Sequence, residues 1–265
     1  MSDAPAPVPF LAFLKRGADA GGFGTATITQ SVTIDCTGTF AGVLVTAVGS
    51  SGILINAAAD DVVRLRGLSI EDFGGSQGVN VQQVGALRIE QCKIFGFVGN
   101  GVTMLVPTGV GRELYVSDSV ISENAGSGIT IAAAGTATVR VSLSNVKLDN
   151  NFQGLLVLSN PFSTGRISLS MRDGTAAGNS QSGIQVDAQG APVVATLDNV
   201  TATTNSTGLR ADGAATRVLI TRLTATSNFT GMSPVNGGVI VSYGDNHINN
   251  NISANGAPTV TQAPQ

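Results

Sequence analysis

Residues 145–157 read NVKLDNNFQGLLV and contain one copy of a repeated unit. In this copy Asn145 is followed six residues later by Asn151, then by a short polar turn and by Gly154, which opens an apolar segment. Further copies of the unit begin at Asp118, Asp173, Asn199 and Arg222. Glycines that open an apolar segment stand at positions 52, 78, 101, 128, 154, 183, 208 and 231, so the unit repeats every 23 to 29 residues.

A repeat of this length indicates a solenoid or an array, in which each unit buries its apolar face only against its neighbours. Apolar residues do not recur at helical spacing, because Gly and β-branched residues interrupt every window. They alternate with polar residues instead, as in residues 139–143 (VRVSL) and 167–169 (ISL). We therefore expect an all-β protein, a single-domain parallel β-helix in which each strand pairs with its counterpart in the next coil.

The second Asn of each unit is expected to stabilise a turn. Asn tolerates the left-handed backbone of turns. When coils stack at a spacing of about 4.8 Å, the side-chain amides can also bond to one another, which forms an asparagine ladder. Phe73 and Phe97 occupy the equivalent position in two earlier coils. We expect an aromatic stack at these coils and an asparagine ladder from Asn124 onward.

Several segments resemble a known class of repeat protein. Residues 65–70 (LRGLSI), 87–90 (LRIE) and 242–246 (SYGDN), together with the repeated glycines, are similar to the right-handed parallel β-helix proteins of the pectate-lyase-like superfamily. Within it, they resemble bacterial members to which no function is assigned. The resemblance covers residues 21–256 and implies a single-stranded right-handed parallel β-helix of about 8–9 coils. It also implies a secreted or cell-surface protein.

The two ends of the chain depart from the repeat. We expect residues 1–20 to form an N-terminal extension that caps the solenoid, residues 21–256 to form the β-helix, and residues 257–265 to form a flexible tail. The apolar run 10–14 precedes its basic residues rather than following them, so we expect residues 1–20 not to be a signal peptide. Exposed solenoid ends make self-association a further hypothesis.

Composition excludes some classes of protein. The net charge is −3, with no basic cluster suited to nucleic acid, and no run of eighteen apolar residues could span a membrane. Cys36 and Cys92 fall about two coils apart, roughly 10 Å, which is too far for a disulfide. We expect both cysteines to be small buried core residues.

One charged patch is the candidate ligand site. The repeat register places Arg64 beside Arg88 and Arg66 beside Glu90, with Ser69 beside Lys93 and Glu71 beside Phe95. Arg and Lys bind carboxylates, so the patch predicts an anion or uronate site; an alternative is a set of cross-strand ion pairs on a solvated surface. The predicted ligand-binding residues are Arg64, Arg66, Glu71, Arg88, Glu90 and Lys93.

Three functions follow from these features, and we favour the first. It is a non-enzymatic scaffold or surface-binding protein, with a polysaccharide or another copy of the chain as its partner. The second is a carbohydrate-active enzyme resembling lyases or hydrolases of this fold, but Asp60 and Asp61 face opposite ways and His247 is the only histidine. We therefore assign no catalytic residue, metal or cofactor. The third is ice binding, suggested by the Thr-Ala-Thr segments 201–203 and 224–226.

Overall fold

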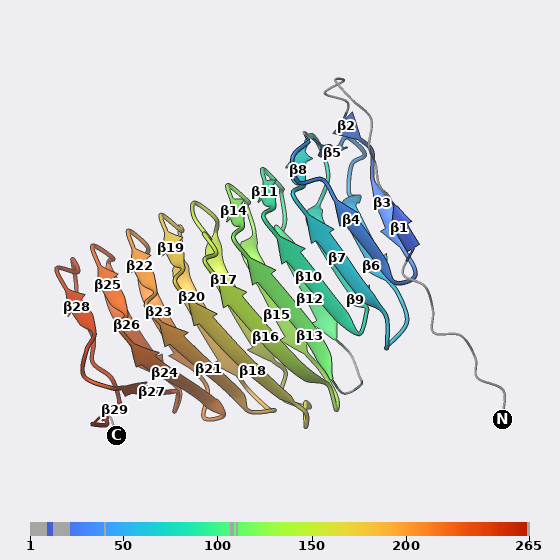
Figure 1. Ribbon diagram of the computed structural model, residues 1–265. Helices are drawn as coiled ribbons and strands as arrows, with labels where there is room; N and C mark the ends of the chain where they lie inside the picture. Colours follow the sequence, from blue (N-terminus) through green and yellow to red (C-terminus); the bar gives the residue numbers. More distant parts are fainter. Residues whose placement is uncertain (1–9, 13–21, 40, 107–108, 110, 264–265) are drawn as a thin grey trace.

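Short parallel strands make up the computed structural model, which describes residues 10–12, 22–39, 41–106, 109 and 111–263. These residues contain no helix, and therefore no helix that could cross a membrane. The chain winds in successive coils across three faces, which we name sheets A, B and C in the order the chain visits them (Figure 1). Each full coil contributes one strand to each sheet, except that the coil of β16 and β17 meets sheet B only through a bridge at Lys147. The predicted parallel β-helix is confirmed.

The three faces have the following strands. Sheet A contains β1 (Phe10–Ala12), β4 (Val32–Asp35), β7 (Val62–Arg66), β10 (Ala86–Glu90), β13 (Arg112–Ser117), β16 (Thr138–Ser144), β18 (Arg166–Arg172), β21 (Val193–Asp198), β24 (Thr216–Thr221), β27 (Val239–Ser242) and β29 (Val260–Thr261). Sheet C contains β3 (Ala26–Ile28), β6 (Ser51–Asn56), β9 (Gln77–Gln83), β12 (Val102–Val106), β15 (Ser127–Ala133), β17 (Gln153–Ser159), β20 (Ser182–Ala188), β23 (Thr207–Asp212) and β26 (Thr230–Val235).

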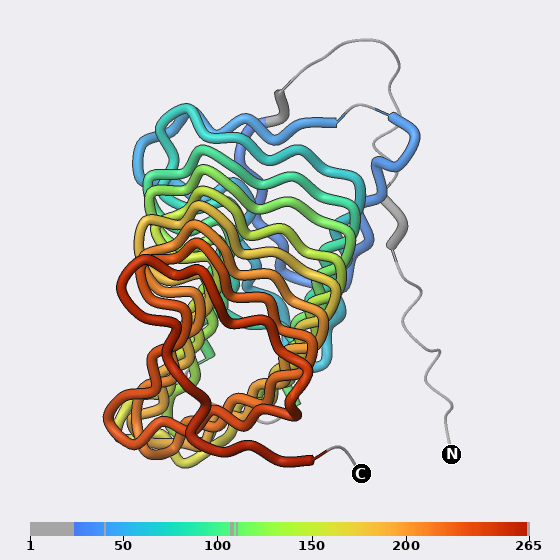
Figure 2. Tube along the Cα trace, turned by 90° about the vertical axis from the view of Figure 1, so that its left-hand side faces the viewer, coloured from blue at the N-terminus to red at the C-terminus, as the bar shows by residue number. Residues whose placement is uncertain are grey.

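Sheet B is built of shorter strands in two groups. The first group is β2 (Gly22–Phe23), β5 (Gly42–Val45), β8 (Ser69–Asp72), β11 (Lys93–Phe95) and β14 (Val120–Ser122), and the second is β19 (Thr175–Ala177), β22 (Thr201–Thr203), β25 (Thr224–Thr226) and β28 (His247–Asn249). Lys147 forms parallel bridges to both Val120 and Thr175, so it joins the two groups. Figure 2 looks along the stack from its C-terminal end and shows the coils lying one behind another.

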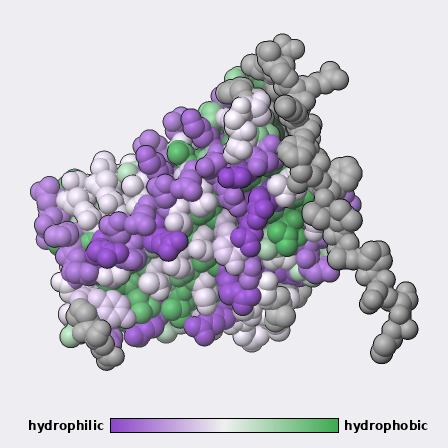
Figure 3. Space-filling model, in the orientation of Figure 1, coloured by the Kyte–Doolittle hydropathy of each residue, from purple (hydrophilic) through white to green (hydrophobic). Residues whose placement is uncertain are grey.

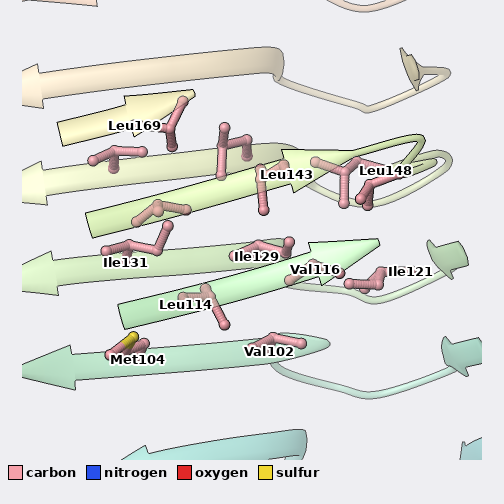
Figure 4. Close-up of a cluster of buried hydrophobic side chains, with 14 of the residues drawn as sticks. Val102, Met104, Leu114, Val116, Ile121, Ile129, Ile131, Leu143, Leu148 and Leu169 are labelled. Carbon is pink, nitrogen blue, oxygen red and sulfur yellow. The ribbon is translucent and has the colours of Figure 1, made fainter. Parts of the chain in front are cut away.

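The alternation in the sequence becomes an inward and an outward set of side chains. In β16, Val139, Val141 and Leu143 are buried, whereas the residues between them are more exposed. Figure 4 shows the result in the middle of the stack, where Leu114 from sheet A and Ile129 from sheet C belong to one buried cluster. Hydrophilic residues cover much of the face turned toward the viewer in Figure 3, with hydrophobic residues in a smaller area. One continuous apolar core therefore runs through the solenoid.

Left-handed backbone makes the two sharp bends of each coil. The first Asn or Asp of the repeat lies at the bend from sheet A to sheet B, as at Asp118 and Asn145, with φ of 50° and 52°. At the bend from sheet B to sheet C, the left-handed residue is the one before the ladder Asn, as at Asn150 with φ of 57°. The turn therefore uses the neighbour of Asn151, which leaves the Asn151 side chain to point into the stack.

The predicted asparagine ladder is present. Its rungs are Asn124, Asn151, Asn179, Asn205, Asn228 and Asn251. At each step the side-chain oxygen of one Asn accepts a hydrogen bond from the backbone N–H of the rung before it, at 2.9 to 3.1 Å. The first donor is the backbone N–H of Phe97, whose side chain is fully buried at the ladder position of its coil.

The predicted aromatic stack of Phe73 and Phe97 is wrong, because Phe73 is 67% exposed. Five positions separate Phe73 from Gly78, whereas four separate Phe97 from Gly101. The longer turn is held by Asp72, whose side chain accepts hydrogen bonds from the backbone of Gly74 and Gly75. The extra residue therefore turns Phe73 toward solvent.

The repeated Gly and the ladder Asn form one packing unit. A Cβ placed on Gly128 would lie 2.8 Å from the carbonyl oxygen of Gly154 and 3.0 Å from Nδ2 of Asn151. Both distances are shorter than carbon atoms normally adopt, so the second position of β15 must be glycine. This contact explains why the two residue types recur at linked positions in the sequence.

The segment after Asn251 closes the C-terminal end of the coil stack. Asn255 accepts hydrogen bonds from both the backbone and the side chain of Asn251, so it takes the place of a further rung. Met232 of β26 donates its backbone N–H to the carbonyl of Asn255, and β29 pairs with β27. At the other end β1 pairs with β4, and the rest of the expected cap at 1–20 lies outside the described residues. Our division of the chain at residues 20 and 256 stays a prediction.

Candidate functional site

Four of the six charged residues predicted from the sequence lie in two neighbouring columns on the outer face of sheet A. Arg64 on β7 lies opposite Arg88 on β10, which lies opposite Tyr115 on β13. In the next column Arg66 lies opposite Glu90. The predicted register is confirmed, because parallel pairing carries the position of one coil directly to the next.

Glu90 lies between two arginines. Its carboxylate oxygens are 3.3 Å from Nε of Arg64 and 3.5 Å from Nε of Arg66. Arg66 also contacts Asp35, with Nη1 at 3.3 Å from Oδ2. Hydrogen bonds from the hydroxyl and amide of Thr37, and the charge of Arg66, lower the pKa of Asp35. Since these side chains are 28% to 42% exposed, the ion pairs add little to stability.

The arginines keep donor capacity that the described residues do not use. The Nε atoms of Arg64 and Arg66 are buried and lie within ion-pair distance of Glu90, yet neither is aligned for a hydrogen bond. Buried donors are normally satisfied. Because these Nε atoms are buried beside Glu90, only the outer nitrogens of the two guanidinium groups can contact a further acceptor at this surface.

Arg88 has an aromatic partner rather than an acidic one. Its guanidinium carbon lies 4.5 Å from the ring centre of Tyr115, a cation–π contact. Within the described part of the chain, no carboxylate lies within ion-pair distance of Arg88. Two like charges directly opposite one another destabilise a sheet. The Arg64–Arg88 pair would therefore gain from an anion bound between them.

The surface continues past the predicted residues. The hydroxyl of Tyr115 donates to Glu113 at 2.9 Å, and Arg140 donates to the other oxygen of Glu113 at 2.6 and 3.0 Å. The bonds from Arg140 and Tyr115 lower the pKa of Glu113, and the bond to Glu113 raises the pKa of Tyr115. The Tyr115 ring is therefore held in place between a cation and an anion.

A shallow hollow of about 300 Å³ lies next to this ring. Its polar lining comes from Tyr115, Arg140, Ser142, Ser168 and Ser170. Sequence reasoning did not include Tyr115, Arg140 or the serines in the site. The register could have found them, because Ser142 and Ser170 continue the column of Arg64 and Arg88 on β16 and β18.

Two of the predicted residues lie elsewhere. Glu71 on β8 and Lys93 on β11 belong to sheet B, beyond the bend at which the chain leaves sheet A. Glu71 lies opposite Phe95, and Lys93 lies opposite Ser69, as the register predicts. The structure thus divides the predicted patch between two faces, and neither residue forms an ion pair within the described ranges.

A family model described as "Right handed beta helix region" matches residues 20–165 of the chain. The chain belongs to this right-handed β-helix family. The match confirms the predicted handedness, which strand pairing by itself leaves open. Among solved structures, the crystal structure of pectate lyase Pel9A is similar over 95% of this chain and 69% of that chain, with a TM-score of 0.54 and 13% identity. At this identity the likeness shows a shared pectate-lyase-like fold. No curated protein matches.

The residues considered for catalysis in this β-helix protein, Asp61 and His247, do not form a cluster. Asp61 accepts hydrogen bonds from the hydroxyl of Ser31 at 2.6 Å and from the backbone of Ala58 at 2.7 Å, which lower its pKa and hold a turn. His247 lies exposed on β28, opposite Thr224. Across the described residues, no group of three or more His, Cys, Asp or Glu side chains is arranged to hold a metal ion.

The threonine rows of the β-helix lie on sheet B. Thr175, Thr201 and Thr224 occupy one column, and Thr203 and Thr226 occupy the next. The first column ends at His247, and Thr175 already donates to the carboxylate of Asp149 at 3.0 Å. The array covers three coils at most.

Proposed function

We propose that this right-handed β-helix protein is a non-enzymatic scaffold that binds an acidic polysaccharide along the outer face of sheet A. The observation that carries the proposal is the Arg64–Arg88 pair, two arginines directly opposite each other, of which Arg88 has no acidic partner in the described part of the chain. A uronate carboxylate between them would relieve the like-charge contact and accept hydrogen bonds from both. The cations Arg64, Arg66 and Arg88 outnumber the anions Asp35 and Glu90, so this part of the surface favours a negatively charged ligand.

The neighbouring residues suit a sugar chain. Tyr115 offers a fixed ring, and Ser142, Ser168 and Ser170 offer hydroxyls that both donate and accept hydrogen bonds. These groups follow the solenoid axis from β13 to β18, so a linear polymer could lie across successive coils. Such a ligand would gain affinity from repeated weak contacts.

The test is binding to a panel of neutral and acidic polysaccharides, followed by size-exclusion chromatography of both protein and polymer. We expect acidic polymers to co-elute with the protein, and neutral ones of similar size to elute alone. Raising the salt concentration should weaken the complex, because the contacts are exposed charges. Failure of every acidic polymer to co-elute would refute the proposal, and a shortened polymer would favour the carbohydrate-active enzyme instead.

A pair of variants locates the site. Arg88→Gln should reduce binding, because it removes the charge that faces Arg64 and the cation above Tyr115. Arg217→Gln is the matched control, since Arg217 is an exposed arginine on β24 of the same sheet, away from the tyrosine. Equal loss in both variants would indicate attraction to overall charge rather than a site on β7 and β10.

A further inference from the structure

A second groove, with a volume of about 720 Å³, lies on sheet C and crosses β9, β12, β15, β17 and β20. Sheets A and C pack against each other through their inner faces, so this groove is separate from the arginine surface. Its volume falls in the range of small-molecule sites. The inference drawn from it is independent of the function proposed for sheet A.

The floor of the groove is a column of outward positions with an unusual composition. From coil to coil the column reads Gln82, Leu105, Ala132, Leu158 and Asp187. Three consecutive apolar residues occupy positions that face away from the core, and Leu105 is 50% exposed. The outward face of a strand is normally polar, so a confined apolar floor between an amide and a carboxylate indicates a binding surface.

Asp187 at the end of the floor lacks a cation. One coil further, Asp212 occupies the same column and is neutralised by Arg210, with Nη2 at 2.7 Å from Oδ2. The residue that corresponds to Arg210 beside Asp187 is Gln185. Asp187 accepts a hydrogen bond from Gln189 at 2.5 Å, and no ion pair involves it among the residues the structure describes. The ion pair that neutralises Asp212 therefore has no counterpart at Asp187, where the groove ends.

Two polar atoms near the floor are also unsatisfied. Gln77 lines the groove, and its Oε1 is buried without a hydrogen-bond partner in the described structure. Thr130, two residues before Ala132 on the same strand and so facing the same way, is 7% exposed, and its hydroxyl has no partner. Buried polar groups of this kind are rare in folded proteins and are often satisfied by a bound molecule or water.

We propose that this groove binds an elongated amphipathic amine, with its aliphatic body on Leu105, Ala132 and Leu158 and its ammonium group on Asp187. Three strand steps separate Leu105 from Asp187, which is roughly 14 Å. A staggered chain of about ten carbons, with C–C bonds near 1.5 Å, covers most of that length.

The test is isothermal titration of the full chain with decylammonium below its micelle concentration. Butylammonium keeps the charge without the chain, and decanoate keeps the chain with the opposite charge. We expect saturable binding of one decylammonium per protein and much weaker binding of the other two. Equal binding of decanoate, or no saturable binding of decylammonium, would overturn the proposal.

Variants separate the groove from general adsorption. Asp187→Asn preserves the shape and the bond to Gln189, and it should weaken decylammonium binding by about tenfold or more, since it removes a charge-assisted contact. Leu158→Gln should also weaken binding, whereas Leu219→Gln, at an outward position of β24 on sheet A, should leave it unchanged. Thermal unfolding identifies any variant that has lost its fold. Unchanged affinity in folded Asp187→Asn would by itself disprove the assignment of the ammonium site.

Discussion

Replacing Asn205 by Leu tests whether the asparagine ladder holds the coils together. Asn205 is 4% exposed and makes four hydrogen bonds with neighbouring coils through its side chain. Its Oδ1 accepts from the backbone and side-chain nitrogens of Asn179 at 2.9 and 3.0 Å. Its Nδ2 donates to the carbonyl of Ala176 at 2.9 Å and to Oδ1 of Asn228 at 3.0 Å. Leucine can replace none of these bonds.

The size of the effect follows from the donors left behind. Leucine branches at the same carbon as asparagine, has the same number of side-chain heavy atoms and is somewhat larger, so the substitution leaves no cavity. It leaves two buried N–H donors of Asn179 without an acceptor, each at a cost of about 1–3 kcal/mol. The free energy of unfolding should therefore fall by about 2–6 kcal/mol, which lowers Tm by roughly 4–12 °C at about 2 °C per kcal/mol.

Thermal unfolding followed by circular dichroism measures this change. Asn249→Leu is the matched control, because Asn249 is exposed on β28 and its side chain makes no hydrogen bond among the described residues. We expect the control to unfold with the parent protein. Because coils interact only with their neighbours, amide hydrogen exchange should also show faster exchange around β20 and β23 than in distant coils. If Asn205→Leu and Asn249→Leu unfold at the same temperature, the ladder does not stabilise the stack.

Three further predictions concern the ends, the ion pairs and the thiols. Removing residues 252–265 exposes the edges of β26 and β27, so the truncated protein should associate end to end. Unaltered monomeric sedimentation at high concentration would contradict this. The folded-state pKa of Glu113 is lowered by Arg140, so the pair stabilises the fold above the ordinary pKa of 4.5 and this contribution is lost as pH falls through the lowered value. Glu113→Gln should therefore be less stable than the parent at neutral pH and equal to it in acid, as measured by urea unfolding. Burial raises the pKa of the Cys92 thiol to about 11 and also raises that of Cys36, so neither should react with a thiol reagent until the protein is unfolded; rapid labelling of the native protein would show that the core opens.

The state of the two cysteines could be predicted from their spacing in the sequence. Cys36 and Cys92 are both free and buried, as their separation by two coils predicts. The arginine column on sheet A and the threonine columns on sheet B likewise lie at the positions that the repeat predicts. In each case the sequence is enough to predict the column and the face of a residue. Side chains in a strand alternate with a period of two, and parallel pairing keeps each position in register with the next coil.

The orientation of individual side chains could not be predicted at the turns, because the turns differ in length and sharpness. Phe73 stands at the ladder position by spacing, yet one additional residue before Gly78 turns it toward solvent. Glu71 and Lys93 seemed to join the arginine patch, but the bend between sheets A and B places them on another face. The sequence does not state how sharply the chain turns, which is set by left-handed residues at positions that several residue types can occupy.

The amino-acid sequence by itself determined the solenoid, its coil register and the asparagine ladder, because these depend on periodicity and on backbone pairing between identical units. Only the tertiary structure decided which polar groups are satisfied. It shows that Arg88 packs on Tyr115, that Arg210 neutralises Asp212, and that Asp187 has no such partner at the end of an apolar groove. Such contacts depend on side-chain direction and on the reach of neighbours from adjacent coils, and these are distances in space rather than along the chain.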